Sequence, residues 1–333
     1  MDSPQTLAHD GGTPPALAPD AAAVAARIVE AVCSVIEGKP DEVRTAVVVL
    51  LAGGHLLLED VPGVGKTMLA KSLAKATGTT VRRVQCTPDL LPSDITGVSI
   101  FNQQTQAFEF RPGAVFTNVL IGDEINRASP KTQSALLEAM EERQVSSDGH
   151  TYPLPRPFLV VATQNPIEME GTYPLPEAQR DRFMARISLG YPTADAELAM
   201  LASHGDSDPL AGLTAVTDAA ELAALIASVR AVHASPAAQR YVVELCRASR
   251  QTTALRLGAS PRAGLQLLQA AKAEAVLAGR DHVLPDDIQA MALPVLVHRL
   301  IPAGGPGHRG VEDVVRELVR VTPVPSAAPG PSR

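Results

Sequence analysis

The sequence predicts an α/β domain built on a parallel sheet, followed by a domain made of helices. Apolar runs typical of buried strands, with helical patterns between several of them, lie at 55–61, 81–86, 118–124, 157–165 and 185–191. Strands as apolar as these need cover on both faces, which is the arrangement of a parallel sheet flanked by helices. From about Pro192 the strand-like runs end, and helical patterns rich in Ala, Leu, Glu and Arg follow one another.

Two helices are predicted before the first strand. An Ala-rich helix is expected from Asp20, a suitable N-cap, to Gly38, and a second helix in PDEVRTAVVVLLAGG (40–54), ending at its glycines. The first domain is therefore expected over 20–191. Residues 1–19 are rich in Pro, Gly and Ala without hydrophobic periodicity, which predicts a disordered N-terminal tail.

Helix starts are clearly marked in the second domain, which is expected over 192–321. Proline at the first helical position costs no hydrogen bond, so helices are predicted to begin at Ser235-Pro236, Ser260-Pro261 and Leu284-Pro285. Residues 322–333 are again rich in Pro, Ala and Ser, and we predict a disordered C-terminal tail there.

Composition limits the class of protein. The chain has 333 residues, 45% of them hydrophobic, which is enough for two domains with cores. Acidic residues outnumber basic ones, 36 to 29, whereas DNA binding normally leaves a basic footprint, so nucleic acid is not the expected partner. Cys33, Cys86 and Cys246 lie far apart and indicate neither a disulfide framework nor a zinc site, which fits the cytoplasm. The chain start lacks the features of a secretory signal, and the longest apolar run, 45–58, is too short to be a transmembrane segment.

The segment DVPGVGKT, residues 60–67, matches the phosphate-loop pattern G-x-x-x-x-G-K-[ST] at every defined position except the first. It follows a predicted strand and opens a predicted helix, so its backbone N–H groups would converge on phosphate at a helix N-terminus. Asp60 replaces the first glycine, but at the strand exit its side chain can point away from phosphate, and we expect nucleotide binding to survive. The alternative is a glycine-rich turn without a ligand. The residues expected to bind the nucleotide are Pro62, Gly63, Val64, Gly65, Lys66, Thr67 and Met68.

Two further predicted strands end in polar residues. VLIGDE ends in Asp123, a ligand for the Mg²⁺ shell together with the Thr67 hydroxyl, and in Glu124, a general base for the attacking water. FLVVATQN ends in Asn165, and open α/β sheets bind ligands at the carboxyl ends of their strands. Asn165 is therefore expected to orient the water or to contact the γ-phosphate. Ordinary polar strand ends, and an Asn-Pro turn, are the alternatives.

Two arginines are candidates for completing the site. Arg182, in EAQRDRF, precedes the last predicted strand at a domain edge, where it could reach the γ-phosphate of a neighbouring subunit as an arginine finger, with Arg180 as a rival. Arg262, in GASPRAGLQLL, lies in the first turn of a helix, where the macrodipole disfavours a cation without an anionic partner. A phosphate from the other domain would be such a partner. A surface ion pair is the alternative for each arginine.

Two β-hairpins are predicted within the first domain, near 97–113 and 142–157, where apolar residues flank polar turns such as Asp148-Gly149. Three of the six phenylalanines lie in the first hairpin. Their rings either project toward a client protein or a ring pore, or pack the hairpin onto the sheet, and we favour the packing role.

Taken together, DVPGVGKT, VLIGDEINRASPKTQSALLEAMEE, ATQNPIEMEGTYPLPEAQRDRF and GASPRAGLQLLQAAKAEAVLAGRDHVLPDDI resemble AAA+ ATPases, specifically the MoxR family, over about 20–322. The resemblance implies a sheet of strand order 5-1-4-3-2 and a helical-bundle lid. It also assigns motif names: Walker A for Lys66 and Thr67, Walker B for Asp123 and Glu124, sensor 1 for Asn165, finger for Arg182 and sensor 2 for Arg262. The departures from the pattern are Asp60, Gly122 and Arg180.

By this resemblance the expected function is an ATP-hydrolysing chaperone with Mg²⁺. It would work as a homo-oligomer, commonly a hexameric ring, and would remodel protein clients or aid metal cofactor insertion, often with a von Willebrand factor A domain partner. The alternatives are a nucleic-acid motor, a chelatase-type motor subunit and a nucleotide sensor that does not hydrolyse ATP. The presence of Glu124 and an arginine candidate argues against the last, because binding alone needs neither.

Overall fold

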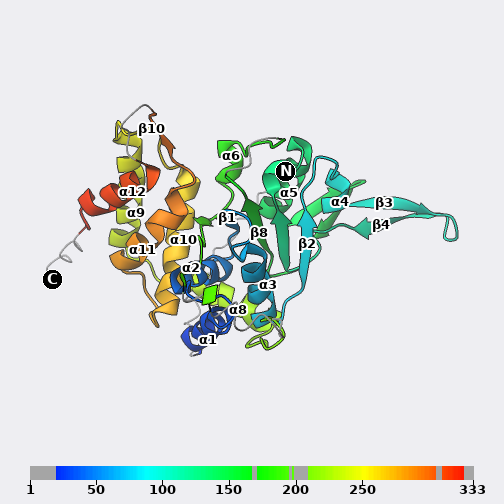
Figure 1. Ribbon diagram of the computed structural model, residues 1–333, viewed down its shortest axis with the longest axis horizontal. Coiled ribbons are helices and arrows are strands. Elements are labelled where there is room, and N and C mark those ends of the chain that lie inside the picture. Colours follow the sequence, from blue (N-terminus) through cyan, green and yellow to red (C-terminus); the bar gives the residue numbers. More distant parts are fainter. Residues whose placement is uncertain (1–19, 167–170, 195–196, 199–208, 305–309, 326–333) are drawn as a thin grey trace, which may run out of the picture.

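The structure is a computed structural model that describes residues 20–166, 171–194, 197–198, 209–304 and 310–325. The predicted tail 1–19, and residues 326–333 of the second tail, lie outside the described residues. An α/β core and a group of helices lie side by side, and a two-stranded arm extends from the core on the side away from those helices (Figure 1).

The core is a five-stranded parallel sheet in the order β2-β5-β8-β1-β9. Counted along the chain, this is the order 5-1-4-3-2 that the resemblance implied, which is confirmed. β1 lies between β8 and β9, so the phosphate loop that follows it leaves from inside the sheet and not from its border. The strands are β1 (Leu56–Glu59), β2 (Val81–Gln85), β5 (Val119–Asp123), β8 (Leu159–Gln164) and β9 (Ala185–Ile187).

Helices cover both faces of this sheet, which explains the unbroken apolar runs. Successive residues of a strand point to opposite faces. Along β1, Leu56 and Leu58 join one buried cluster, while Leu57 joins a second cluster on the other face. The core helices that contribute to the first cluster are α1 (Ala21–Cys33), α2 (Pro40–Leu51) and α3 (Lys66–Ala76), and α5 (Pro130–Glu142) contributes to the second.

The first helix is shorter than predicted. α1 begins after Asp20 but ends at Cys33, and the Asp20 side chain makes no capping hydrogen bond. Because Pro40 disfavours helical backbone at Lys39, α1 cannot continue into α2. Gly38, with φ of +73°, belongs to the turn between the two helices.

The helical lid follows the predicted starts. α9 (Pro236–Gln251) and α10 (Pro261–Leu277) are capped by Ser235 and Ser260, whose hydroxyl groups accept the backbone N–H of Ala238 and Ala263. The remaining lid elements are α11 (Pro285–Leu296), α12 (Val311–Val321) and the antiparallel pair β10 (Leu255–Leu257) and β11 (Ile301–Pro302). This pair was not predicted, because strands of 3 and 2 residues are too short to show periodicity. None of the helices in the described part of the chain is both long and apolar enough to cross a bilayer.

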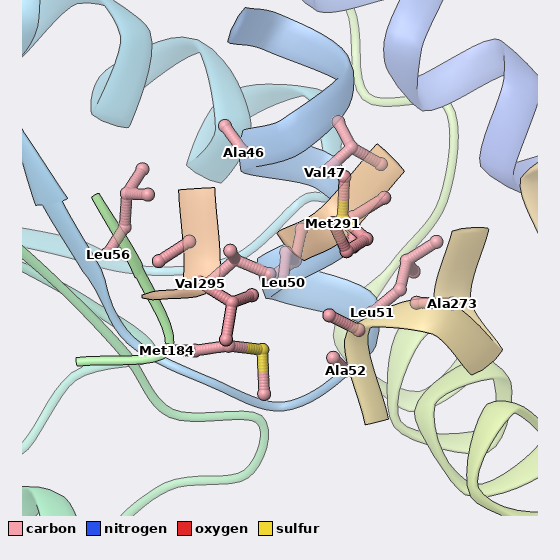
Figure 2. Packing of buried hydrophobic residues seen from close by; sticks show 14 of the residues in the cluster. Ala46, Val47, Leu50, Leu51, Ala52, Leu56, Met184, Ala273, Met291 and Val295 are labelled. Carbon is pink, nitrogen blue, oxygen red and sulfur yellow. The ribbon is translucent and has the colours of Figure 1, made fainter. Parts of the chain in front are cut away.

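The lid shares a buried cluster with the core. Figure 2 shows side chains of α2, among them Leu50 and Leu51, lying among residues of the lid helices, including Ala273 of α10 and Met291 of α11. Apolar burial contributes roughly 25 cal/mol per Å², so this contact stabilises the position of the lid on the core.

Two antiparallel hairpins interrupt the core. They are β3 (Gly97–Asn102) with β4 (Ala107–Pro112), which form the arm in Figure 1, and β6 (Gln144–Ser147) with β7 (His150–Pro153). Phe110 stacks on Tyr152 with ring centroids 3.9 Å apart, so it packs one hairpin on the other. Phe101 and Phe108 are 49% and 74% exposed. The predicted packing role therefore fits Phe110 alone, and its stacking partner belongs to the second hairpin.

Candidate functional site

The phosphate loop has the backbone conformation that its glycines predict. Gly63 and Gly65 have φ of +85° and +93°, where L side chains are strained, and Gly65 stands at the N-cap of α3. Open space surrounds both α-carbons. The Lys66 ammonium donates hydrogen bonds to the carbonyl oxygens of Asp60 at 2.6 Å and Val61 at 2.8 Å, both at the start of the loop. Burial lowers the pKa of Lys66, and nearby carboxylates, first that of Asp60, oppose this shift.

Asp60 turns its side chain away from the loop. Its carboxylate accepts hydrogen bonds from the Val61 N–H at 2.9 Å, the Ser188 hydroxyl at 3.0 Å and the Gly190 N–H at 2.6 Å. Asp60 is 7% exposed, and its φ is not positive, so this position does not need the freedom of glycine. The departure from the phosphate-loop pattern therefore leaves the loop backbone intact.

Oxygen atoms of Thr67 and Asp123 meet where a metal ion is expected. The Thr67 hydroxyl lies 3.3 Å from Asp123 Oδ2, and the Thr163 hydroxyl lies 3.3 Å from Oδ1 of the same carboxylate. Hydroxyl and carboxylate oxygens are the ligands that Mg²⁺ prefers, so these residues fit the ion. In this structure Asp123 Oδ2 also forms an ion pair of 2.6 Å with Arg83 Nε.

Glu124 is held in a defined position beside Asp123. Its φ of +56° is rare for a residue with a side chain, and its backbone N–H donates to the Thr163 hydroxyl at 3.0 Å. Its carboxylate accepts a hydrogen bond of 2.9 Å from Gln85. Asn165 directly follows β8, the strand between β5 and β1, and is 6% exposed. The topology thus places Asn165 at the same sheet edge as Asp123 and Lys66.

The sequence interpretation did not identify Arg83, Gln85 and Thr163. Arg83 and Gln85 are two residues apart on β2, and β2 lies next to β5, with Gln85 in register with Asp123. The sequence does indicate that Arg83 and Gln85 lie on the same face of their strand, because side chains alternate between the two faces along VRRVQC. Which strand would lie beside β5 could not be read from the residues alone.

The structure places the two candidate arginines together but apart from this group. Arg182 Nε lies 3.2 Å from one carboxylate oxygen of Glu141, and Arg262 forms an ion pair with the other. Glu141 lies in the last turn of α5. The preceding residue, Met140, accepts a hydrogen bond of 3.1 Å from Nε2 of His55, just before β1 begins.

This pairing puts the arginines at the amino end of the strands. β1 alone is 4 residues long, which is about 13 Å of extended chain. Arg182 and Arg262 are therefore separated by the depth of the sheet from the phosphate loop at its carboxyl end. Arg180 lines a different cavity, of about 530 Å³, together with Arg186 and His298.

Comparison with known proteins agrees with this geometry. Residues 55–185 match the family described as ATPase family associated with various cellular activities (AAA), and residues 247–318 match the AAA lid domain. A crystal structure of a candidate ATPase from Cytophaga hutchinsonii superposes with a TM-score of 0.85 at 37% identity, covering 92% of this chain and 96% of that one.

Three relatives indicate the family to which the chain belongs within the AAA ATPases. The chain is 48% identical to the protein YeaC of Bacillus subtilis, over 90% of this chain and 94% of that protein. It is 44% identical to the chaperone MoxR1 of Mycobacterium tuberculosis, over 83% of this chain and 75% of that protein. It is 34% identical to the protein MoxR of Paracoccus denitrificans, over 88% and 94%. The chain belongs to the MoxR family of AAA ATPases.

Proposed function

We propose that this protein hydrolyses ATP at the carboxyl edge of its sheet. The observation that carries the proposal is the meeting of Lys66 and Thr67, which follow the phosphate loop, with Asp123 at the end of β5, where Thr67 and Asp123 oxygens lie 3.3 Å apart. A phosphate-binding loop alone would explain nucleotide binding. The adjacent pair of carboxylates, Asp123 and Glu124, also supports hydrolysis.

Each residue has a distinct role in this proposal. Lys66 leaves the carbonyl groups of Asp60 and Val61 and binds the β and γ oxygens. Thr67 and Asp123 would hold Mg²⁺, which would supply positive charge to the phosphates. Glu124 accepts the proton of the attacking water, and Asn165 orients that water.

Arg182 and Arg262 complete the site of a neighbouring subunit in this proposal. The support is that both arginines pair with Glu141 at the opposite edge of the sheet. A nucleotide in the phosphate loop of the same chain is separated from them by the core and so could not take the place of Glu141. Phosphate from the adjacent subunit would displace the Glu141 carboxylate. This requires a head-to-tail ring of identical chains, which we propose to be a hexamer.

The ring is proposed to act as a chaperone on protein clients. The support is the 44% identity with a protein named chaperone MoxR1, together with the exposed rings of Phe101 and Phe108 on the arm. We also propose that the ring works on protein complexes, aids metal cofactor insertion and binds a von Willebrand factor A domain partner. The proposed location is the cytoplasm, since Cys33, Cys86 and Cys246 are all unpaired.

ATP hydrolysis per subunit, measured over a range of protein concentrations, tests the proposal. Specific activity should rise as subunits assemble, and Glu124→Gln and Arg182→Ala should each lose it, by about a thousandfold for a finger. Arg180→Ala is the matched control, because Arg180 lines another cavity, and it should retain activity. Wild type that binds ATP but hydrolyses it no faster than Glu124→Gln at every concentration would contradict the proposal.

A further inference from the structure

One residue, Asp60, contacts both the phosphate-loop lysine and the exit of the last core strand. Its carbonyl oxygen accepts a hydrogen bond from the Lys66 ammonium at 2.6 Å. Its carboxylate accepts hydrogen bonds from Ser188 and Gly190, which lie 128 and 130 residues away along the chain. The main chain of Asp60 therefore belongs to the phosphate site, and its side chain belongs to another part of the molecule.

The segment that Asp60 holds leads out of the core. β9 ends at Ile187, and after Tyr191 the chain continues toward α8 (Ala219–Ala231), which packs on both α2 of the core and α10 of the lid. Lys39 also contacts this segment, through a hydrogen bond of 3.2 Å from its ammonium to the Tyr191 carbonyl. Along the chain, the segment thus lies between the last core strand and α8, which contacts both the core and the lid.

The Asp60 carboxylate is suited to transmitting a change rather than to binding a ligand. It is buried, and its oxygens accept hydrogen bonds from three protein groups at 2.6 to 3.0 Å. Removing such an acceptor leaves the partly buried Gly190 N–H without the Asp60 carboxylate as its partner, which is costly in a folded protein. A glycine at position 60 would fit the phosphate-loop pattern better, yet it would break this connection.

We propose that Asp60 is a positioning residue that couples phosphate binding in the loop to the segment Ser188–Tyr191, at the exit of the last core strand. The inference rests on the proposed function, because it requires nucleotide in the loop. Nucleotide draws Lys66 away from the Asp60 carbonyl and orders the loop backbone. Once that backbone is ordered, the carboxylate it carries holds Gly190 more firmly, so ligand binding stabilises the junction.

The Gly190 amide reports directly on this coupling, because its proton is the one that Asp60 accepts. Hydrogen–deuterium exchange of the full chain, with and without Mg²⁺ and the β,γ-imido analogue of ATP, measures it. In wild type the analogue should slow exchange of Gly190 by about tenfold, within the range usual for coupled sites. In Asp60→Gly the slowing should vanish. Affinity for the analogue should fall by no more than the same factor of about ten, because coupling is reciprocal.

Two further variants keep the test sharp. Ser188→Ala removes one donor to the carboxylate and should reduce the slowing only in part, and it supplies the comparison together with Asp60→Asn should Asp60→Gly fail to fold. Glu59→Gln is the matched control, since it alters the neighbouring residue of β1, whose carboxylate binds Arg186 instead. It should show the wild-type slowing.

Equal slowing in wild type and Asp60→Gly would overturn the inference. So would folded Asp60→Gly that no longer binds the analogue, because the carboxylate would then serve the loop itself. Wild type that binds the analogue without slowed exchange overturns the inference alone. Wild type that binds no analogue overturns the proposed function and this inference with it.

Discussion

At the scale of single residues, the two acids of the candidate site already have protein partners. Arg83 pairs with Asp123 and Gln85 binds Glu124, both from β2. The Arg83 guanidinium supplies the positive charge that Mg²⁺ would bring to Asp123. Because its side chain is 53% exposed, the ion pair is screened by water and contributes little to stability. Arg83 thus holds the Asp123 carboxylate, the proposed metal ligand, in place.

Arg83→Met should therefore strengthen binding of Mg²⁺ with nucleotide by about two- to fivefold, since the ion no longer competes with the guanidinium for Asp123 Oδ2. Titration of Mg²⁺ against a fluorescent nucleotide measures the effect. Arg82→Met is the control, because Arg82 donates to the Gly113 carbonyl instead. Weaker binding in Arg83→Met alone would mean that Arg83 contacts the nucleotide.

At the scale of elements, one buried arginine joins the lid to the core. Arg299, just after α11, has a side chain that is 2% exposed, and its Nε lies 2.9 Å from Asp181 Oδ1. It also donates to the carbonyl oxygens of Phe183 and Met184. Burial lowers the pKa of Arg299 to about 10, and the Asp181 carboxylate opposes this shift. These bonds fix the turn that carries Arg182.

Removing the carboxylate should destabilise the connection between lid and core. Asp181→Ala leaves a buried guanidinium without its counter-ion, and the free energy of unfolding should fall by about 3 to 5 kcal/mol. Urea denaturation measures this change. Asp313→Ala, which removes an exposed acid of α12 that pairs with surface Arg316, should change the unfolding free energy by less than about 0.5 kcal/mol. Similar values for the two variants would contradict the structural role of Asp181.

At the scale of the whole molecule, a buried histidine lies between the sheet and helix α5. His55 accepts the backbone N–H of Val160 through Nδ1 and donates through Nε2 to the carbonyl of Met140, so it links β8 to α5. Burial lowers the pKa of His55 from 6.5 to about 4. Protonation would both charge the buried ring and remove the acceptor that Val160 uses.

The stability of the molecule should therefore depend on pH in a defined window. Between pH 6.5 and about 4, His55 is protonated in the unfolded chain but not in the folded chain. The free energy of unfolding therefore falls as the pH falls, by up to about 1.4 kcal/mol per pH unit. The contribution of His55 is fully present above pH 6.5. Burial also lowers the pKa of His298, which acts with the same sign.

Urea denaturation at several pH values between 7.5 and 4.5 checks this expectation. His55→Gln should be less stable than wild type at pH 7.5 and should lose stability more slowly as the pH falls. His150→Gln, which changes an exposed histidine on β7, should keep the wild-type slope. An unchanged slope in His55→Gln would show that His55 does not control the acid sensitivity.

Features set by residues close together in the chain were predicted, whereas several contacts between distant residues were not. The strand order was confirmed, and the helix starts at Ser235 and Ser260 and the glycine conformations at 63 and 65 follow from residues within a few positions of each other. Glu141 pairs with two arginines that lie 41 and 121 positions further along the chain, and no sequence pattern predicts this pairing. Likewise, Asp60 was expected to point away from phosphate, but its partners Ser188 and Gly190 were not predicted.

The sequence by itself determined the alternation of buried strands and helices, the phosphate loop and the acids at the end of β5. These depend on backbone conformation and on apolar periodicity, which short segments encode. Only the tertiary structure decided which carboxylate each arginine binds and which edge of the sheet each arginine occupies. Ion pairs form between whichever charges the completed packing brings within a few ångströms, and that proximity is a property of the folded chain rather than of any segment.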